Sequence, residues 1–505
     1  MDKRMRCHTQ AMPSLLSIDA GTTAVKVSLF DERGRMATSS LQEYTLLTPA
    51  EDWVELPAEV YWQSCVGGIR EVLAQPGVTP EEILAVGVTS QGETLIPVGG
   101  EGQPLRNAIV WLDNRARAEA QAVAASFELD RFYEVTGLPE IIPTWPACKI
   151  LWLREQERET FVQAHKYLLV EDYLLYRLSG RYVTEGGVCT STGYFDIQTG
   201  QWWREMLDFI GVSPEQLPAP LGSGEVVGPV CEDASRETGL STRTLVVSGA
   251  MDQIAAAVGA GNIAPGVISE TTGTALVLAF TVNEPTYDPQ KRLPCYYHAL
   301  PGKYLLLPYC QTAGMAFRWF RDQFGQGQSY DQLTALAAEV PPASEGLLML
   351  PHLAGSTSPH FNPRARGVFY GITLGHTRAH FVRAILEGVA FMLRENVELL
   401  QELGVEVGEL VSLGGGARST LWLQIKADVT GLPLRASECE EATSLGVAIL
   451  AAVAVDLFPD VATACQQMVS IGPRIEPSSA HRALYEAAYD RYLRLYSSLQ
   501  PLFGS

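Results

Sequence analysis

Short apolar runs along the chain alternate with loops of small residues and with longer segments that repeat apolar residues at helical spacing. The short runs predict buried strands at residues 14–18, 25–30, 83–88, 245–248, 266–269, 275–280 and 410–413. The longer segments predict helices at residues 62–73, 380–400 and 420–430. This alternation is typical of an α/β protein, in which helices cover the sheets.

Both halves of the chain contain a strand, a turn of small residues and a second strand. The turns lie at residues 19–23 and 271–274, so we expect a duplicated ATPase core. A chain of 505 residues is long for one core, which favours two domains of roughly 200–250 residues each. We expect no regular element in the Gly/Pro-rich stretch 218–229, a domain boundary near it, and a loose tail over residues 1–13.

Composition and charge narrow the class of protein. With 47% hydrophobic and 19% charged residues, the chain can bury sizeable cores. A net charge of −20 argues against a nucleic-acid binder, which needs a basic surface. Nine singly scattered cysteines indicate reduced thiols rather than a zinc site or a disulfide framework. Because no signal-like or membrane-length apolar run occurs, we expect a cytoplasmic protein that handles small molecules.

An acid follows the strand predicted at residues 245–248. Asp252 closes the sequence Ser-Gly-Ala-Met-Asp and precedes Gln253 and an Ala-rich segment. A carboxylate placed there can accept a proton from a substrate, so Asp252 is a candidate general base. The alternative is that Asp252 caps a helix that begins near Ile254.

Three loops have the composition of phosphate or nucleotide sites, because Gly allows close approach of N–H donors and Thr adds a hydroxyl. Two of them supply the candidate phosphate-binding residues Asp19, Gly21, Thr22, Thr23, Lys26, Gly273 and Thr274. Asp19 is also a candidate Mg²⁺ ligand. The third loop supplies the candidate nucleotide-binding residues Gly414, Gly415, Gly416 and Ala417. Each loop alone is as readily a structural turn, and no Walker-type motif is present.

These residues, taken in order, resemble the FGGY carbohydrate kinase family, a branch of the actin-like ATPase superfamily. The most specific segment runs from Gly367 through His380 to Glu387 and resembles the family's long C-terminal signature. Residues 146–153 resemble an earlier family signature, from which Thr144 departs. The resemblance covers most of the chain.

Further residues resemble the family's adenine site, namely Gln424, Asp428 and the run 441–446. The resemblance implies a two-domain actin-like ATPase fold, related to ribonuclease H, with the active-site cleft between the domains. Residues 14–256 would form the N-terminal domain, which binds acceptor sugar and phosphate. Residues 257–505 would form the C-terminal domain, which binds the nucleotide.

The resemblance also assigns roles to single residues. Asp252 stands at the family's catalytic base, and Asp19 stands at the acid near Mg²⁺. Thr22, Thr23 and Lys26 fall where the family contacts ATP phosphates, and Gly273 and Thr274 match its second phosphate loop. Acceptor-binding positions correspond to Gln91, Glu93, Trp111, Asp113 and Gln253.

Two of these acceptor positions have an equally ready structural explanation. Trp111 is as readily a packing aromatic, and Asp113 as readily an ion-pair partner of Arg115 or Arg117 at a surface. The implied cofactors are ATP and Mg²⁺. Because family members often form homodimers, the resemblance implies a homodimer here, with a small sugar or polyol as ligand and no nucleic-acid or membrane partner.

The acceptor is predicted to be a pentulose, as for xylulokinases. The sequence around Gln91 and Glu93 and the pair Asp252–Gln253 resemble glycerol kinases more than xylulokinases. Glycerol kinases, however, carry Arg at the position of Gly92 and Tyr at that of Thr144. Losing both groups enlarges the pocket, which favours a five-carbon ketose and leaves glycerol or another polyol as the alternative.

Two other functional classes stay open. One is an actin-like ATPase that drives a partner, and the other is a silent sugar-binding regulator. The FGGY-like segments 149–153 and 367–387 disfavour the first class. The presence of Asp19, Lys26 and Asp252 disfavours the second.

Overall fold

The computed structural model describes residues 13–503, so the tail expected over residues 1–13 lies, except for Pro13, outside the described residues. The chain forms two compact units, which confirms the two-domain expectation. Unit 1 holds the described residues up to Phe127, then Ile141–Gly261 and Thr443–Val469. Unit 2 holds Glu128–Glu140, Asn262–Ala442 and the described residues from Ser470 onward.

The chain passes between the two units at several points, whereas the sequence suggested a single boundary at residues 256–257. The main crossing lies at Gly261–Asn262, close to that boundary. Helix α3 (Leu129–Thr136) belongs to unit 2, where the Tyr133 hydroxyl donates to the Leu293 carbonyl at 2.8 Å. Helix α15 (Ala442–Ala454) belongs, from Thr443 on, to unit 1.

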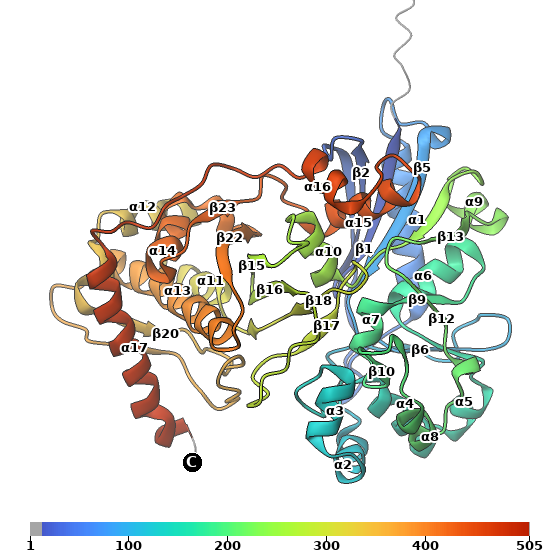
Figure 1. Ribbon diagram of the computed structural model, residues 1–505, viewed down its shortest axis with the longest axis horizontal. Coiled ribbons are helices and arrows are strands. Elements are labelled where there is room, and N and C mark those ends of the chain that lie inside the picture. Colours follow the sequence, from blue (N-terminus) through green and yellow to red (C-terminus); the bar gives the residue numbers. More distant parts are fainter. Residues whose placement is uncertain (1–12, 504–505) are drawn as a thin grey trace, which may run out of the picture. The chain divides into compact units, whose positions relative to one another are not determined.

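A six-stranded sheet in the order β13-β14-β5-β1-β2-β3 organises unit 1. Its strands are β1 (Ser14–Ala20), β2 (Ala24–Asp31), β3 (Met36–Glu43), β5 (Ile83–Ser90), β13 (Val226–Pro229) and β14 (Leu245–Ser248). Strands β1 and β2 form the predicted antiparallel hairpin, and β5 lies parallel to both β1 and β14. Figure 1 shows β1, β2 and β5 in blue beside helix α1 (Ala58–Leu73).

A second sheet, in the order β17-β18-β16-β15-β22-β23, organises unit 2. Its strands are β15 (Gly266–Thr272), β16 (Leu276–Val282), β17 (Cys295–Tyr297), β18 (Tyr304–Leu306), β22 (Val407–Leu413) and β23 (Leu434–Ala436), and the short β19 (Tyr309–Cys310) pairs with β16. Strands β15 and β16 again form an antiparallel hairpin. Strand β15 also lies parallel to β22, and β22 lies parallel to β23. Read from its other edge, this sheet contains β23-β22-β15-β16-β18, which repeats the order and directions of β14-β5-β1-β2-β3 in unit 1 and confirms the duplicated core.

The Gly/Pro-rich stretch 218–229 is not irregular, and both expectations for it were wrong. Strand β12 (Ala219–Leu221) pairs parallel with β9 (Val183–Glu185). Strand β13 pairs antiparallel with β14 through a register shift. Both lie within unit 1, away from its boundary. Because proline is tolerated on edge strands and at irregular pairings, Pro229 can end β13, and the prolines concealed two real strands.

Helices cover both sheets. In unit 1 the further helices are α2 (Arg117–Ser126), α4 (Pro146–Gln156), α5 (Arg158–Gln163), α6 (Val170–Ser179), α7 (Gly186–Thr190), α8 (Arg204–Ile210), α9 (Glu232–Thr238), α10 (Asp252–Gly259) and α16 (Val461–Met468). In unit 2 they are α11 (Gly314–Phe324), α12 (Tyr330–Ala338), α13 (Arg378–Glu402), α14 (Thr420–Thr430) and α17 (Arg482–Phe503). Short strands β4 (Glu55–Leu56), β6 (Ile96–Val98), β7 (Ala108–Ile109), β8 (Lys166–Leu168), β10 (Phe195–Asp196), β11 (Gln201–Trp202), β20 (Leu348–Leu350) and β21 (Val368–Tyr370) form two-stranded ladders.

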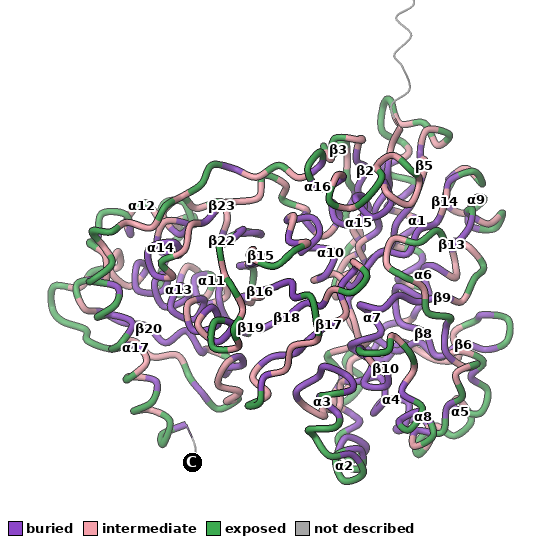
Figure 2. The backbone as a smooth tube through the Cα atoms, viewed as in Figure 1, coloured by how far each residue is buried: buried purple, intermediate pink, exposed green. Residues whose placement is uncertain are grey.

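Helix α14 has the bounds that the sequence predicted, and local signals mark both of its ends. Helix α14 begins where the Ser419 hydroxyl accepts the Trp422 N–H at 3.2 Å, and it ends at Gly431, which adopts φ 70°. A serine cap and a left-handed glycine are the usual start and stop of a helix. Most of α13 and α14 is buried, as Figure 2 shows in purple. Among the described helices, none is long and apolar enough to cross a membrane.

Candidate active site

Asp252 is the first residue of helix α10, directly after the loop that follows β14. Met251 occupies the N-cap position and no side chain caps this helix, so the expectation that Asp252 caps it was wrong. The Asp252 side chain is half-buried, which leaves room for a substrate. Burial raises its pKa to about 6, and hydrogen bonds from the Gln253 backbone and side chain oppose this rise.

Glu93 is electrostatically linked to Asp252. It follows the end of β5 and adopts φ 63°, a left-handed conformation that few non-glycine residues take and that is often found at functional sites. Burial raises the pKa of its carboxyl to about 7, Lys149 lowers it, and the negative charge of Asp252 raises it further. The structure therefore brings the candidate base and one predicted acceptor-binding residue into one electrostatic environment.

Lys149 holds two loops of this site together from helix α4. Its side chain is fully buried, and its ammonium donates to the backbone carbonyls of Glu93 at 2.9 Å and Val110 at 3.0 Å. A third carbonyl, that of Ile109, lies at 3.4 Å. Burial lowers the pKa of Lys149, while the charges of Glu93 and Asp113 oppose this shift. Sequence reasoning placed Lys149 only in a family signature and missed this role, although a lysine inside an apolar helix was a signal.

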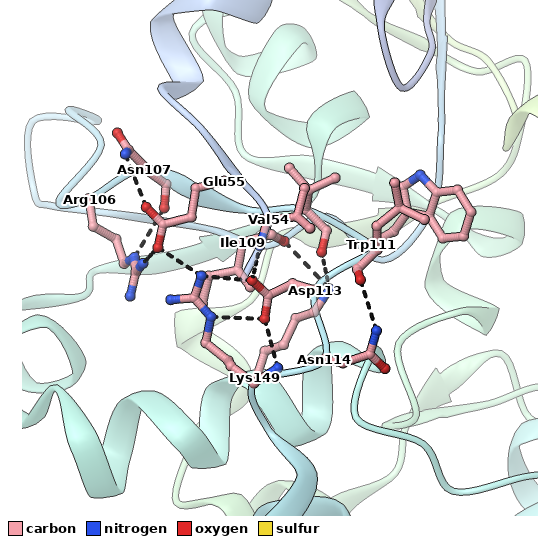
Figure 3. Close-up of polar contacts among 12 residues, drawn as sticks. Val54, Glu55, Arg106, Asn107, Ile109, Trp111, Asp113, Asn114 and Lys149 are labelled. Atoms are coloured by element: carbon pink, nitrogen blue, oxygen red, sulfur yellow. Dashed lines mark hydrogen bonds and ion pairs between the residues drawn. The ribbon is translucent and has the colours of Figure 1, made fainter. Parts of the chain in front are cut away.

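Asp113, labelled in Figure 3, is fully buried and forms an ion pair with Arg115. The guanidinium donates to both carboxylate oxygens, at 2.8 Å from Nε and 2.7 Å from Nη2. The Val54 N–H binds Oδ2 at 2.5 Å. The ion-pair interpretation of Asp113 is therefore the one that the structure shows, with the pair in the interior rather than at a surface. With both oxygens engaged, Asp113 shapes the loop, and its contact with an acceptor stays a prediction.

Arg115 joins this loop to its surroundings. Its Nη2 also lies 2.8 Å from Glu55 Oε1, and its guanidinium stacks over the Trp53 ring with the carbon 3.7 Å from the centroid. Glu55 in turn pairs with Arg106 and accepts from Asn107 Nδ2 at 3.1 Å, as Figure 3 shows. Buried charges held in such a network fix the geometry of the segment that carries Trp111.

Trp111, itself a predicted acceptor-binding residue, contacts the first phosphate loop. Its indole N–H donates to the Thr22 hydroxyl at 3.0 Å, and its backbone N–H donates to the Thr94 hydroxyl at 3.1 Å. Gln91 lies deeper, where its amide donates to the Tyr61 hydroxyl at 2.9 Å. Within the described structure the buried Gln91 Oε1 has no hydrogen-bond partner. Trp111 and Thr22 are thus brought together, whereas Gln91 is largely enclosed.

The first phosphate loop is the tip of the β1–β2 hairpin. Asp19 and Lys26 stand opposite each other in its register, and both are half-buried. The turn closes where the Gly21 N–H donates to the Ala24 carbonyl at 3.0 Å, and the Tyr44 hydroxyl donates to the Gly21 carbonyl at 2.6 Å. Thr22 is half-buried and Thr23 is exposed at this tip.

The second phosphate loop ends β15 in unit 2. Gly273 and Thr274 are exposed, and Thr274 lines a cavity of about 250 Å³ with Met315, Arg318, Trp319, Asp322 and Gln323. Helix α11 begins at Gly314, which lies close against this loop. A Cβ at this position would lie only 2.3 Å from the Gly273 carbonyl oxygen. Sequence reasoning missed Gly314 and Arg318. No motif marks them, and only the fold brings them to the loop.

A larger cavity of about 310 Å³ lies where the glycine-rich loop follows β22. It is lined by Gly414, Gly415, Ala417, Arg418, Ser437, Glu438, Cys439, Glu440 and Glu441. The loop predicted to bind the nucleotide therefore borders a cavity, although Gly416 is buried beneath it. Three acids, Glu438, Glu440 and Glu441, line the same cavity.

Gln424 and Asp428 lie elsewhere. The Gln424 amide donates to Asp428 Oδ1 at 2.7 Å, and Asp428 also accepts the Ser478 N–H and pairs with His481, both at 2.7 Å. They tie α14 to the segment 476–481 and do not line the cavity, so their expected place in the adenine site is not supported. Helical spacing could not reveal which face of α14 meets the cavity.

Comparison with known proteins agrees with this architecture. A family model for the FGGY family of carbohydrate kinases, N-terminal domain, matches residues 14–259, and one for the C-terminal domain matches residues 269–455. The xylulose kinase of Bacillus subtilis (strain 168) is 28% identical, over 97% of this chain and 98% of its own. The gluconokinase of the same organism is 30% identical, over 97% and 94%.

The solved structures give the same picture. The ligand-bound xylulose kinase from Lactobacillus acidophilus superimposes with a TM-score of 0.90 at 26% identity, covering 98% of this chain and 99% of that one. The family models and these relatives together show that the protein is a phosphotransferase that acts on an alcohol group. The chain belongs to the FGGY family of carbohydrate kinases, which transfer phosphate to an alcohol group.

Proposed function

We propose that this protein phosphorylates a neutral pentulose, with ATP as donor and Asp252 as the general base. The observation that carries the proposal is a half-buried carboxylate at the start of α10 whose pKa is raised to about 6 beside Glu93. A base with a pKa close to the working pH is ionised at pH 7 and still accepts a proton. The proposal places base and acceptor in unit 1 and the nucleotide in unit 2.

In the proposed step, a hydroxyl oxygen of the sugar forms a bond to the γ-phosphorus while the bond to the β-γ bridging oxygen breaks. The hydroxyl proton passes to a carboxylate oxygen of Asp252, and ADP carries away the charge of the leaving oxygen. Such transfers depend mainly on positioning and on charge stabilisation. Lys149 would fix the Glu93 loop, and Trp111 would fix Thr22 at the phosphate loop.

Mg²⁺ fits this arrangement as an ion that arrives with the nucleotide. Mg²⁺ in kinases is held by one or two carboxylates, by water and by substrate phosphates. Asp19 offers a half-buried carboxylate at the end of β1. Within the described residues, no cluster of three or more acids, histidines or cysteines could hold a metal by itself. When bound, the ion would neutralise charge on the transferring phosphoryl group.

The charges around Glu93 favour a neutral acceptor over a sugar acid. The charges that act on Glu93 are Lys149 and Asp252. The Lys149 ammonium is already bound to backbone carbonyls, so it is not available to a substrate carboxylate. An aldonate such as gluconate would bring a third negative charge to Glu93 and Asp252, which is costly in a partly buried site.

The test is acceptor-dependent ADP release with Mg-ATP and a panel of acceptors. The panel contains D-xylulose, D-ribulose, L-ribulose, L-xylulose, glycerol, erythritol and gluconate. A pentulose with the highest kcat/KM would support the proposal. Preference for gluconate would overturn the neutral acceptor, preference for glycerol would favour the polyol alternative, and sugar binding without ADP release would indicate a silent regulator.

We also propose, from the sequence and the family resemblance, a cytoplasmic homodimer without a nucleic-acid partner. Light scattering of the purified chain tests the dimer directly. A mass of one chain, about 55 kDa, would contradict it.

A further inference from the structure

We propose that a buried ion pair in unit 2, Glu270–Lys426, is a positioning device that holds the two nucleotide loops 271–274 and 414–417 against each other. The inference rests on the proposed nucleotide site in unit 2. Glu270 lies on β15 and Lys426 on α14, 156 residues apart in the chain. In Figure 1 these two elements lie in the part of unit 2 that also contains β22.

The pair is completely enclosed. Lys426 Nζ lies 2.6 Å from Glu270 Oε1, and both side chains have 0% exposure. Two hydroxyls complete the cluster. Thr272 Oγ1 donates to Glu270 Oε2 at 2.8 Å and accepts from Lys426 Nζ at 2.9 Å. Ser412 Oγ donates to Glu270 and lies 3.3 Å from Lys426 Nζ.

The hydroxyls belong to the strand ends that carry the loops. Thr272 ends β15 and is part of the second phosphate loop, while Ser412 is the penultimate residue of β22. Gly416 completes the connection, because a Cβ there would lie 2.7 Å from Thr272 Cβ and 3.3 Å from Lys426 Nζ. The nucleotide loop thus rests directly on the phosphate loop and on the ammonium of the pair.

Stability does not require this arrangement. Desolvating two charges costs about as much as their attraction returns, and apolar residues of similar size often stabilise a fold as well. A fully bonded buried cluster does, however, fix a single geometry. Since four groups from three elements meet here, the cluster sets the distance between the two loops.

Unit 2 offers a matched control in Arg383–Glu387. This pair is also buried, with 6% and 2% of the side chains exposed and 2.8 Å between Nε and Oε1. It bonds to the Tyr485 hydroxyl and the Val340 carbonyl, and none of its contacts reaches either nucleotide loop. Replacing it tests what the loss of any buried pair does to the protein.

The experiment compares the double variant Glu270→Leu/Lys426→Met with Arg383→Met/Glu387→Leu. Removing both charges avoids an uncompensated buried charge, which single variants would leave. We expect the first double variant to bind Mg-ADP at least about tenfold more weakly, by calorimetry, because small misplacements at such sites are costly. The nucleotide KM should rise in parallel, with the acceptor KM unchanged, and the control should change neither.

Unchanged ADP affinity in the Glu270/Lys426 variant, or an equal loss in the control, would overturn the proposal. If this double variant does not fold, Glu270→Gln/Lys426→Met, which also removes both charges, serves in its place, and the same split between nucleotide and acceptor KM is decisive. Binding of ADP does not depend on the acceptor. If the protein without substitutions binds ADP but phosphorylates no sugar, only the proposed function is refuted. If it binds no nucleotide, both the proposed function and the proposed role of the ion pair are refuted.

Discussion

The two units share a core of five strands in the same order, but the acidic side chains at their two proposed sites have opposite surroundings. In unit 1, Asp252 and Glu93 are half-buried, and burial raises the pKa of each. In unit 2, Glu270 is fully enclosed and bound by Lys426, Thr272 and Ser412. A carboxylate without a cationic partner can exchange a proton, whereas a fully bonded one can only hold a shape. In the proposed account, one duplicated fold supports proton transfer in one half and loop positioning in the other, because the side chains and not the fold decide the function.

The largest effect should come from removing the base of unit 1. We expect Asp252→Asn to lower kcat by about 10²–10⁴-fold, the usual contribution of a general base, with Mg-ADP affinity unchanged. Steady-state kinetics and calorimetry measure the two quantities. The matched control is Asp233→Asn, an exposed acid of the same unit that pairs with Arg236. Turnover within threefold of the unmodified protein would remove Asp252 from the mechanism.

Lys149→Met should have the next largest effect. The substitution removes the Lys149 donor from the Glu93 carbonyl, while the Ile109 and Val110 carbonyls keep the N–H groups of Leu95 and Asp113 as donors. We therefore expect a loss of about 1–3 kcal/mol in the free energy of unfolding. The acceptor KM should rise as the Glu93 loop relaxes. Urea denaturation measures the loss, with Lys166→Met, a half-buried lysine that also binds two carbonyls, as control. Equal losses in the two variants would show that Lys149 has no special role.

The pH dependence should separate the two units. Asp252 must be ionised to accept a proton, so kcat/KM should fall about tenfold per pH unit below pH 6. Mg-ADP binding in unit 2 should not follow this curve. The effect on folding has the opposite sign, because a raised pKa means that the folded state holds the proton more tightly. The free energy of unfolding should decline as the pH rises from about 4 to about 6. A flat kinetic profile from pH 5 to pH 8 would contradict this role.

The smallest effect is expected for the link between Trp111 and Thr22. Trp111→Phe keeps an aromatic side chain but removes the indole N–H and its hydrogen bond of 3.0 Å, worth about 0.5–1.5 kcal/mol. We expect kcat/KM to fall about two- to tenfold. Trp202→Phe, at another half-buried tryptophan of unit 1, controls for the loss of the indole. If both variants keep full activity, the hydrogen bond does not position the phosphate loop.

Much of the fold could be predicted from local patterns. The apolar runs predicted the strands of both hairpins, and the helix 420–430 was predicted with its actual bounds. The structure shows that Ser419 and Gly431 mark its ends. The strands within 218–229 were missed, since prolines at edge strands carry the same signal as a loop. Local periodicity finds elements but says little about their partners.

The candidate site was predictable only where a motif is contiguous. Asp19 lies at the end of a strand, Gly414 directly follows one, and Asp252 follows the short loop after another. The Asp113–Arg115 pair was one of two open interpretations, because sequence could not tell a buried segment from an exposed one. Partners far apart in the chain, such as Glu270 and Lys426, meet only through the packing of β15 against β22 and α14.

The most direct test of the central claim is the stoichiometry between ADP and phosphorylated sugar. Unmodified protein is incubated with Mg-ATP and each pentulose, and mass spectrometry counts the product that is one phosphate heavier than the sugar. The account predicts one phosphorylated sugar for each ADP and little ADP without a sugar. ADP formed at the same rate with and without every acceptor, and no phosphorylated sugar, would contradict it.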